Sequence, residues 1–374
     1  MEVDVAIVGA GPAGSTLATL LTGRGCSVVL IDRDSFPRDK LCGEFLSWDA
    51  LPILERLGVS LSGTPAIDRC RIAGRRRSYQ FEFPSPARGV SRRLLDDLLF
   101  RQAAATGAQT RPSCMVTAVS HDRVTTDAGD IGARVVVGAW GRWGRFDTQL
   151  KRAFVRDRAH RNFGFKRHYQ FSSCDDRNAV VLHPFRRGYL GVAAIEGLRT
   201  NICGLVHASR LAGHKGRWEA FVDEIRREEP HLDALFAAHN PAQDDFLSSE
   251  PVIFRARSAV EDGIFMIGDA SGIIDPLTGN GMAMAIQSAL LAAPFILEAL
   301  AGRRDEAGRG YRRRHNEFFA PRIAWSRRVA FLLARPALLD AAMAAAPRSS
   351  GPFLLRKTRA AGDQVARILD QWLA

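Results

Sequence analysis

Apolar positions along the chain follow two different periods. Short β-branched runs at 3–8 and 264–267 are typical of buried parallel strands. Residues 161–209 are β-rich, whereas 285–374 show helical spacing broken at Pro321, Pro336, Pro347 and Pro352. This order (a βαβ unit, a β-rich insertion, then a returning strand) predicts an α/β fold whose first domain is assembled from separate stretches of the chain.

The remaining elements follow from local pattern. We expect helices over 15–22, 90–108 and 216–229, strands over 27–31, 113–119, 123–127 and 134–139, and a strand–turn–strand over 69–85. Residues 34–59 begin as a loop and end in a helix stopped by Gly58. No apolar run approaches the roughly 18 residues of a membrane span. Because the N-terminus enters a strand at once, we expect no signal peptide and a cytoplasmic location.

A glycine motif follows the first strand. Residues 9–14, GAGPAG, fit G-x-G-x-x-G, in which the glycines allow a tight turn, close approach to a pyrophosphate and packing of helix on strand. Asp32 ends the second strand about 20 residues later, where a carboxylate binds a ribose hydroxyl and disfavours a 2′-phosphate. The predicted contacts are Gly9, Gly11, Pro12, Ala13, Gly14, Asp32 and Arg33. This motif alone does not distinguish FAD from NAD as the bound dinucleotide.

A second glycine cluster, GIFMIGDASGIIDPLTGNGMAMA at 263–285, distinguishes the two. Asp269 ends a strand where it can accept a hydrogen bond from a ribityl hydroxyl, a group that FAD has and NAD lacks. The helix that follows directs its positive end towards the flavin ring, where the reduced ring carries negative charge. The predicted contacts here are Gly268, Asp269, Gly279, Asn280, Gly281 and Met282.

With these motifs the chain resembles the FAD-dependent superfamily of p-hydroxybenzoate-type hydroxylases and geranylgeranyl reductases over most of its length. The resemblance implies a glutathione-reductase-like (Rossmann-type) FAD domain formed by 1–68, 88–150 and 251–310. It implies an inserted antiparallel β-sheet substrate domain formed by 69–87 and 151–250, with a C-terminal helical region at 311–374. Arg92, in VSRRLLDDLL, matches an arginine that touches the cofactor in this family.

Two segments are more similar to the reductase branch. They are GDASGIIDPLTGNG at 268–281 and PRDKLCGEFLS at 37–47, which would place Cys42 near the flavin ring. Hydroxylases usually have a histidine where Ser271 stands, and the W-x-W-x-I-P signature of tryptophan halogenases is absent. One departure is Trp140, which replaces the aspartate of the family's G-A-D-G motif and leaves nicotinamide delivery open. The other is RRGYLGV at 186–192, which replaces the reductases' aromatic signature, so geranylgeranyl itself is not implied.

Net charge is +12, nearly all of it from arginine, and the arginine-rich runs lie at 71–77, 311–322 and 325–335. A solvated basic surface explains these runs without a partner. An anionic carrier protein or a membrane surface contacted by 351–374 remains an alternative, whereas no nucleic-acid module accompanies the charge. The cysteines lack metal-ligand spacing, so we expect free thiols and no metal: Cys26, Cys42, Cys70, Cys114, Cys174 and Cys203.

The sequence therefore predicts an FAD-dependent oxidoreductase that transfers a hydride at flavin N5 to or from a lipophilic or aromatic small molecule, with NAD(P)H as the candidate transient electron donor. The weak candidates for acid–base or substrate contact are His168, Tyr169, His183, Tyr189 and Cys42. A lone histidine or tyrosine on a sheet is more often structural, and Cys42 is equally consistent with a buried inert thiol. A flavin monooxygenase acting on a phenolic or polyketide-like ring and a non-catalytic flavin-binding scaffold remain alternatives. The oligomeric state stays open.

Overall fold

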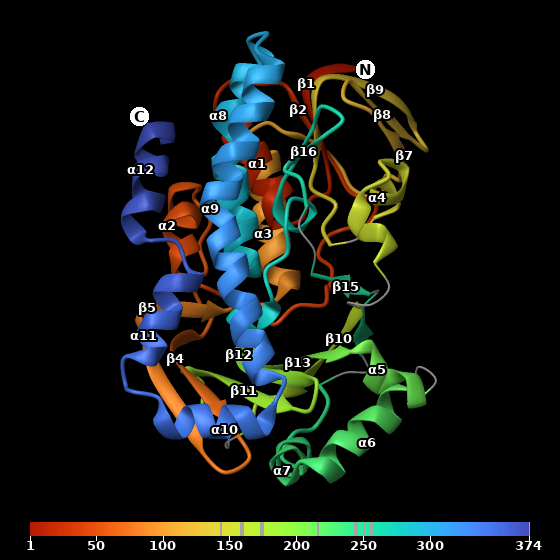
Figure 1. Cartoon of the computed structure of the whole chain (residues 1–374). Helices are drawn as coiled ribbons and strands as arrows, with labels where there is room; N and C mark the ends of the chain where they lie inside the picture. Colours follow the sequence, from red (N-terminus) through yellow and green to blue (C-terminus); the bar gives the residue numbers. More distant parts are fainter. Residues whose placement is uncertain are drawn as a thin grey trace.

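The computed structural model describes residues 1–142, 144–157, 161–172, 176–214, 217–242, 246–249, 251–254 and 257–373. Trp143 and Cys174 lie outside the described residues. A parallel sheet with helices forms the upper part of the molecule in Figure 1, and an antiparallel sheet forms the lower part. The long helix α9 (Arg304–Leu333) runs along both parts. This arrangement matches the expected α/β fold with an inserted sheet.

The upper sheet forms where the β-branched runs predicted it. Among the described residues it has eight strands, in the order β16-β17-β9-β1-β2-β6 with the β7–β8 hairpin beside β9. The pairs that β1 makes with β2 and β9 are parallel. The strands are β1 (Glu2–Val8), β2 (Val28–Ile31), β6 (Gln109–Arg111), β7 (Val116–Val119), β8 (Arg123–Thr126), β9 (Gly129–Gly138), β16 (Val260–Glu261) and β17 (Ile264–Met266).

Alternate residues of these strands face two different cores. One face packs against α1 (Pro12–Thr22), α3 (Arg92–Ala105) and α8 (Gly281–Leu300). The other face packs against β7, β8 and α4 (Arg145–Gln149). Both faces of the parallel strands are covered, which explains why these strands read as continuous apolar runs. The carboxyl ends of β1 and β17 therefore carry the two glycine motifs at the same edge of the sheet.

The lower sheet has nine strands within the described residues, in the order β14-β10-β13-β12-β11-β4-β5-β3, and β15 also pairs with β10. Its pairs are antiparallel except for β11 with β4. The strands are β3 (Phe45–Leu46), β4 (Ala66–Ala73), β5 (Ser78–Gly89), β10 (Arg161–Gln170), β11 (Ala179–Phe185), β12 (Gly188–Ile195), β13 (Arg199–His207), β14 (Leu247–Ser248) and β15 (Val252–Ile253). Strand β3 joins this sheet although it lies within 1–68.

The two faces of the lower sheet have different neighbours. The outer face packs against α6 (Trp218–Glu228) and α7 (Pro230–Ala237). The inner face looks towards the upper part and packs against the 273–277 loop, α9 and α10 (Pro336–Ala345). Strand registers place these side chains on the inner face: Lys166 and His168 on β10, Asn201, Cys203 and Leu205 on β13, Tyr189 and Gly191 on β12, Leu182 on β11, and Cys70 and Ile72 on β4.

The C-terminal region is helical, with α9, α10, α11 (Ser350–Thr358) and α12 (Gly362–Leu373). The expectation that Pro321 breaks a helix is wrong, because Pro321 lies inside α9, a single helix of 30 residues. Because Pro321 has no N–H, the Glu317 carbonyl lacks its helical donor. Both residues lie on the exposed side of α9, where water can donate a hydrogen bond to this carbonyl. Pro336 and Pro352 instead lie in the first turns of α10 and α11, where proline is tolerated.

Helix α8 also differs from expectation. It is 20 residues long and is apolar enough by composition to cross a membrane, although we expected no such run. Most of its side chains are buried between α1, α9 and the upper sheet, so it is the central core helix of the FAD domain. The shorter helices are α2 (Leu51–Arg56), which contributes Ile53 and Leu54 to the core of the upper part, and α5 (Ala208–Leu211), which follows β13.

Candidate functional site

The first glycine motif forms the tight strand-to-helix turn that the sequence predicts. Gly9 has a left-handed φ of +109°, and a Cβ there would lie 2.4 Å from the Ala139 carbonyl oxygen. A Cβ on Gly14 would lie 1.9 Å from the Gly9 carbonyl oxygen. Both contacts are far below van der Waals distance, so only glycine lets α1 approach β1 this closely.

The second glycine cluster meets the first. Gly268 has a φ of +61°, and a Cβ there would lie 3.0 Å from Cβ of Ala13. The Gly268 N–H donates to Ser288 Oγ on α8 at 2.7 Å, which ties the turn to the helix. The two loops that were predicted to hold opposite ends of one cofactor therefore touch each other at the edge of the upper sheet.

Open space remains at two backbone positions of this edge. A Cβ on Gly11 would meet only Arg92 Nη2, at 3.5 Å, and a Cβ on Gly281 would meet nothing within 4 Å. These positions begin α1 and α8, whose first turns offer free N–H groups and the positive ends of helix dipoles. The structure therefore supplies a cradle with room for an anionic pyrophosphate and a flavin ring edge.

Around this cradle the predicted contacts take different positions. Arg92 lies beside Gly11 and is held by Asp96 at 2.7 Å, and this partner keeps the pKa of Arg92 raised although burial alone would lower it. Asn280 is fully buried, with its amide donating to the Thr358 carbonyl at 2.6 Å and its Oδ1 lacking a partner. Gly279 adopts a left-handed φ of +62° before α8 begins, and Met282 is buried in the core.

At the adenosine end, Asp32 lies at the carboxyl end of β2 and accepts the Ala10 N–H at 2.8 Å. Arg33 is not brought to this point; its side chain is 67% exposed and faces Asp34. Arg38 takes its place, donating to Asp32 at 3.0 Å and stacking on Phe36. Sequence reasoning missed Arg38 because it arrives from the loop that follows β2, and residue spacing gave no signal for it.

The flavin end carries a buried carboxylate among arginines. Burial raises the pKa of Asp269, and the charges of Arg142, Arg257 and Arg92 oppose that rise. Arg257 donates to the Asp269 carbonyl at 3.0 Å, and burial lowers the pKa of Arg257 to about 10. An acceptor carboxylate compensated in this way suits a ligand that donates hydroxyl hydrogen bonds.

Trp140 does not enter the cradle. Its ring packs against Phe146 with 5.1 Å between ring centroids, and its Nε1 donates to Asp147 at 3.4 Å. Asp147 pairs in turn with buried Arg152, which donates to the Ala270 carbonyl at 2.9 Å. Trp140 is therefore a core residue under the second glycine turn, and Arg142 is the side chain from this segment that reaches the Asp269 charge.

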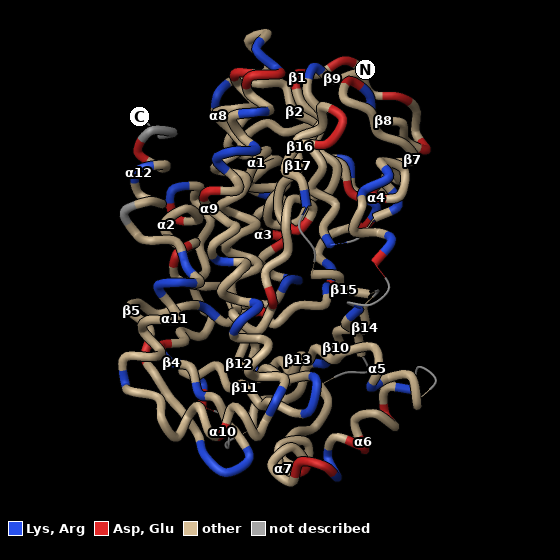
Figure 2. The backbone as a smooth tube through the Cα atoms, in the orientation of Figure 1, with Lys and Arg blue, Asp and Glu red and all other residues tan. Residues whose placement is uncertain are grey.

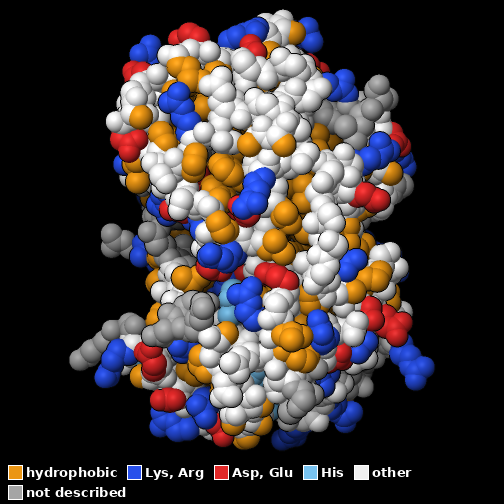
Figure 3. All heavy atoms as spheres, turned by 180° about the vertical axis from the view of Figure 1, so that it is seen from behind, with side chains coloured by type: hydrophobic (Ala, Val, Ile, Leu, Met, Phe, Trp, Pro, Cys, Tyr) orange, Lys and Arg blue, Asp and Glu red, His pale blue; other side chains and the backbone are white. Residues whose placement is uncertain are grey.

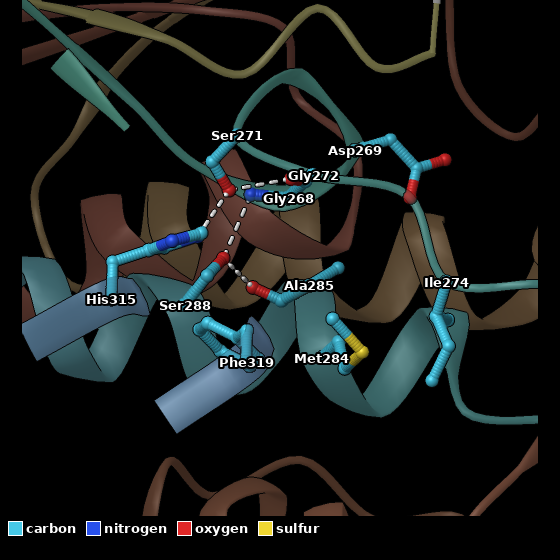
Figure 4. A pocket seen from close by; sticks show the side chains of 10 residues that line it. All are labelled: Gly268, Asp269, Ser271, Gly272, Ile274, Met284, Ala285, Ser288, His315 and Phe319. Carbon is cyan, nitrogen blue, oxygen red and sulfur yellow. Dashed lines mark hydrogen bonds between the residues drawn. The ribbon is translucent and has the colours of Figure 1, made fainter. Parts of the chain in front are cut away.

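Figure 4 shows a small cavity behind the turn at 268–272. Its volume is about 10 Å³, and Ser271 Oγ lies 2.9 Å from His315 Nε2 on α9. Burial lowers the pKa of His315 to about 4, which keeps the imidazole neutral. Asp269 points away from this cavity in Figure 4. The tertiary structure thus brings a histidine next to Ser271, the position where hydroxylases usually carry one in sequence.

A buried ion cluster joins the two parts of the molecule. Glu44, with no exposed surface, contacts Lys166 Nζ and His168 Nε2 on the inner face of the lower sheet, each at 2.6 Å. It also accepts the Arg92 N–H at the start of α3 at 2.9 Å. Burial alone would raise the pKa of Glu44, but the hydrogen bond from His168 and the charge of Lys166 hold it below its ordinary value. An ionised carboxylate therefore ties the lower sheet to the helix that presents Arg92.

The same strands hold the Cys42 segment. Asn201 donates to the Cys42 carbonyl at 3.0 Å, and Lys166 donates to the Lys40 carbonyl at 3.2 Å. Asp39, Glu44 and His168 have ligand atoms within 4.8 Å of one another, but the Lys166 ammonium already occupies the Glu44 carboxylate. We therefore assign this group as an ion-pair cluster rather than a metal site.

The candidate catalytic residues separate onto two faces. His168 and Tyr189 lie on the inner face of the lower sheet, and Cys42 lies on the loop above that face. Tyr169 and His183 lie on the outer face, among the side chains that pack under α6 and α7. His183 stacks on His231 with centroids 5.5 Å apart, and burial lowers its pKa to about 3. This placement corrects the expectation that Tyr169 and His183 face a substrate between the two parts.

Asp275 was not among the predicted site residues. It caps the turn before α8, accepting the Leu277 N–H at 3.1 Å, and burial raises its pKa to about 7. Its charge acts on Tyr189 of the inner face, whose own pKa is raised chiefly by burial. The D-P dipeptide in the second glycine cluster was visible in the sequence, but only the tertiary structure places it against the lower sheet.

Comparisons with known proteins agree with this geometry. The profile described as "FAD binding domain" matches residues 2–311. A menaquinone reductase of Mycolicibacterium smegmatis is 28% identical over 100% of this chain and 94% of its own length. A tryptophan 2-halogenase of Chondromyces crocatus is 27% identical over 82% of this chain, and the match spans only 63% of that enzyme.

Structural comparison gives the same fold. A geranylgeranyl bacteriochlorophyll reductase-like protein of Thermoplasma acidophilum superposes with a TM-score of 0.78 at 18% identity, covering 99% of each chain. Other relatives are named as halogenases of a pyrrole attached to a peptidyl-carrier protein. These names include reductases and halogenases, and a probable FAD-dependent monooxygenase of Pseudomonas aeruginosa also superposes, with a TM-score of 0.72 at 19% identity, covering 92% of this chain and 100% of its own.

Substitution of Gly11 tests the cradle. Gly11 has a negative φ and only a flexible side chain nearby, so Gly11→Ala should leave the unfolding temperature of the apoprotein within a degree or so. The added methyl occupies the space for the pyrophosphate, so we expect the Kd for FAD, measured by flavin fluorescence quenching, to rise at least about tenfold. Gly213→Ala, at another open position, is the matched control. Unchanged affinity in Gly11→Ala would contradict the cradle.

Substitution of Glu44 tests the buried cluster. Glu44→Gln leaves the Lys166 charge buried without its counterion, which should lower the free energy of unfolding by about 3 to 5 kcal/mol. The matched control is Glu196→Gln, which alters a less buried acid that also binds the start of α3, through Ser91. We expect a loss there of about 1 kcal/mol. Equal losses in urea unfolding of the two variants would show that the cluster carries no special role.

Proposed function

Because this chain belongs to the family of proteins with this FAD binding domain and is an FAD-dependent oxidoreductase, we propose that it saturates a double bond of a lipophilic small molecule by hydride transfer at flavin N5. The observation that carries this proposal is the inner face of the lower sheet. Below the 273–277 loop that face is built from apolar and weakly polar side chains, among them Ile72, Leu182 and Leu205. In this structure the 273–277 loop, α9 and α10 cover these side chains, and we propose that a lipophilic substrate binds against this apolar surface.

The relatives support the direction of the reaction. The similarity to menaquinone reductase spans the whole chain, whereas the similarity to the halogenase leaves more than a third of that enzyme unmatched. The halogenase signature W-x-W-x-I-P is also absent from this sequence. Both points favour reduction of an unsaturated lipophilic compound over halogenation.

The residues of this chain would divide the work around the cofactor. Bound FAD supplies the hydride chemistry. Gly11 and Arg92 would hold the pyrophosphate, Asp32 the adenosine ribose, and Asp269 the ribityl hydroxyls. The N-terminus of α8 at Gly281 would stabilise negative charge at the flavin ring edge, and the Glu44 cluster fixes the distance between this site and the lower sheet.

Saturation of a double bond also needs a proton. We infer that the Asp275 carboxyl holds it, because this group is buried in the loop before α8, and its pKa of about 7 leaves about half of it protonated at pH 7 and most of it protonated at lower pH. The Tyr189 hydroxyl beside it remains protonated throughout, because burial raises its pKa. Asp275 would donate from a carboxyl oxygen to the carbon next to the one that receives the hydride.

A flavin monooxygenase is the alternative, favoured by the histidine that α9 places next to Ser271. A substrate attached to a carrier protein is compatible with either reaction. The names of two halogenase relatives refer to a substrate of that kind.

Product analysis distinguishes these reactions. Reduced holoenzyme is mixed without oxygen with a lipophilic polyprenyl quinone, and NADPH and NADH are compared as electron donors. We expect flavin reoxidation and a product that, after its ring is reoxidised to the quinone in air, retains two added hydrogens in the polyprenyl chain and carries no added oxygen. An oxygenated product formed only in air would establish the monooxygenase, and a halogenated product formed in air with chloride or bromide would establish a halogenase. Flavin that no donor reduces would establish a scaffold.

The pH dependence tests Asp275. As a donor it must be protonated, so turnover should fall about tenfold per pH unit above pH 7. Because the raised pKa means that folding favours the protonated form, stability contributed by this carboxyl is present below about pH 4 and is lost as the pH rises through about 7. Asp275→Asn should abolish the loss of folding stability that occurs as the pH rises through about 7, and it should lower turnover at every pH. A variant with a flattened stability curve but a wild-type rate profile would limit Asp275 to a structural role.

A further inference from the structure

The lower end of the molecule gathers arginine-rich segments that are distant in sequence. Gly74, in the turn between β4 and β5, lies against Asp340 and Met343 of α10. Tyr79 on β5 donates to the Pro347 carbonyl at 3.0 Å. The ring of Trp325 on α9 packs on that of Phe353 on α11, with 5.4 Å between the ring centroids. The 71–77 and 325–335 runs and the α11 region therefore meet at the lower left of Figure 1.

The exposed side chains here define a surface that we call the basic apolar end. Its exposed cations are Arg76, Arg77, Arg327, Arg328, Arg335, Arg348, Arg356 and Lys357, and none of them forms an ion pair with an acid in the described part of the chain. Its exposed apolar side chains are Phe331, Leu338 and Phe353, which are half of the exposed large hydrophobic residues in the described ranges. Asp340, the one acid of α10, is half-buried. Figure 2 shows blue segments at this end.

Cations and aromatic rings are interleaved across this surface. The Arg335 guanidinium lies 3.6 Å from the centroid of Phe331, and that of Arg328 lies 4.7 Å from the centroid of Trp325. Lys357 lies 5.6 Å from the centroid of Phe353. Such pairs place an apolar ring and a positive charge next to each other on the surface. This combination suits a membrane interface, where anionic headgroups meet acyl chains.

The inner side of the same helices leads to the site. Leu333 at the end of α9 and Leu339 on α10 are buried against the inner-face cluster that contains Ile72, Leu182 and Tyr189. The helices that expose the basic apolar end therefore also cover the apolar floor of the proposed substrate site. Figure 3 shows further hydrophobic side chains gathered in the middle of the opposite view, between the two parts.

From these observations we propose that the basic apolar end docks this protein on an anionic lipid bilayer, through α9, α10, α11 and the β4–β5 turn, so that a lipophilic substrate enters the inner face from the membrane. The entry route rests on the proposed function, whereas the docking does not. Nucleic acid would match the charge but not Leu338 and Phe353. Within the tail at 351–374 that the sequence suggested, α11 with Phe353 belongs to this surface, whereas α12 packs Val365 and Leu369 into the FAD-domain core.

Vesicle binding tests the docking independently of any reaction. Holoenzyme is mixed with vesicles of equal parts phosphatidylglycerol and phosphatidylcholine, or of phosphatidylcholine alone, and the bound fraction is measured by flotation. We expect binding to the anionic vesicles alone and a loss of binding at high salt. Arg328→Gln with Arg356→Gln should weaken it about tenfold to thirtyfold.

The matched control lies on the same helix at the other end of the molecule. Arg309 and Arg313 are exposed on the first half of α9, so Arg309→Gln with Arg313→Gln removes the same charge and should change binding by less than about twofold. Phe331→Ser with Phe353→Ser tests the apolar contribution at constant charge and should also weaken binding.

Equal losses in the two arginine pairs would overturn the proposal, as would absence of binding to the anionic vesicles. Binding of an acidic acyl-carrier protein that Arg328→Gln with Arg356→Gln abolishes, without vesicle binding, would overturn it in favour of a protein partner. If vesicles bind but the polyprenyl quinone is not reduced, the docking stands and the proposed function fails.

Discussion

The ionised carboxylate of Glu44, buried between Lys166, His168 and the start of α3, is the interaction on which the site depends. It is the point where a loop of the FAD domain, the inner face of the lower sheet and the helix that presents Arg92 meet. Burying a charge costs desolvation free energy, which only well-placed partners offset. The three elements must therefore keep the relative position in which all these partners contact Glu44. That position sets where the glycine loops lie relative to the inner face of the lower sheet.

Burial sets the protonation behaviour of the two carboxylates in the second glycine loop. Asp269 is surrounded by arginine charge, whereas Asp275 has mainly a backbone N–H as its partner, so burial raises the pKa of Asp275 to about 7. The two carboxylates lie a few residues apart on one loop, yet one is suited to accept hydrogen bonds and the other to carry a proton. Placing both within one loop allows cofactor binding and proton supply to share a single structural support.

The arginines fall into two groups. The paired arginines, such as Arg69, Arg92 and Arg152, hold segments together. Exposed arginines that form no ion pair among the described residues lie at both ends of α9, and those of the basic apolar end lie beside exposed aromatic side chains. An excess of unpaired cations around exposed aromatic side chains is stable in water only because the cations remain hydrated, and it becomes favourable when an anionic surface covers it.

The sequence by itself determined the features that depend on local backbone chemistry. The positions of Gly9, Gly14 and Gly268 are set by steric contacts within a few ångströms, so their motifs predicted the turns, the cofactor and the parallel sheet. The long helix through Pro321 was missed because local pattern does not show that Pro321 and Glu317 lie on the exposed side of α9, where the carbonyl that loses its N–H partner is open to solvent. Only the tertiary structure decided which face each candidate side chain occupies, since His168 and Tyr169 are adjacent and point to opposite sides of one strand. It likewise brought Arg38 to Asp32, His315 to Ser271, and the arginine runs at 71–77 and 325–335 to one end, because such contacts join residues whose separation in sequence follows no regular period.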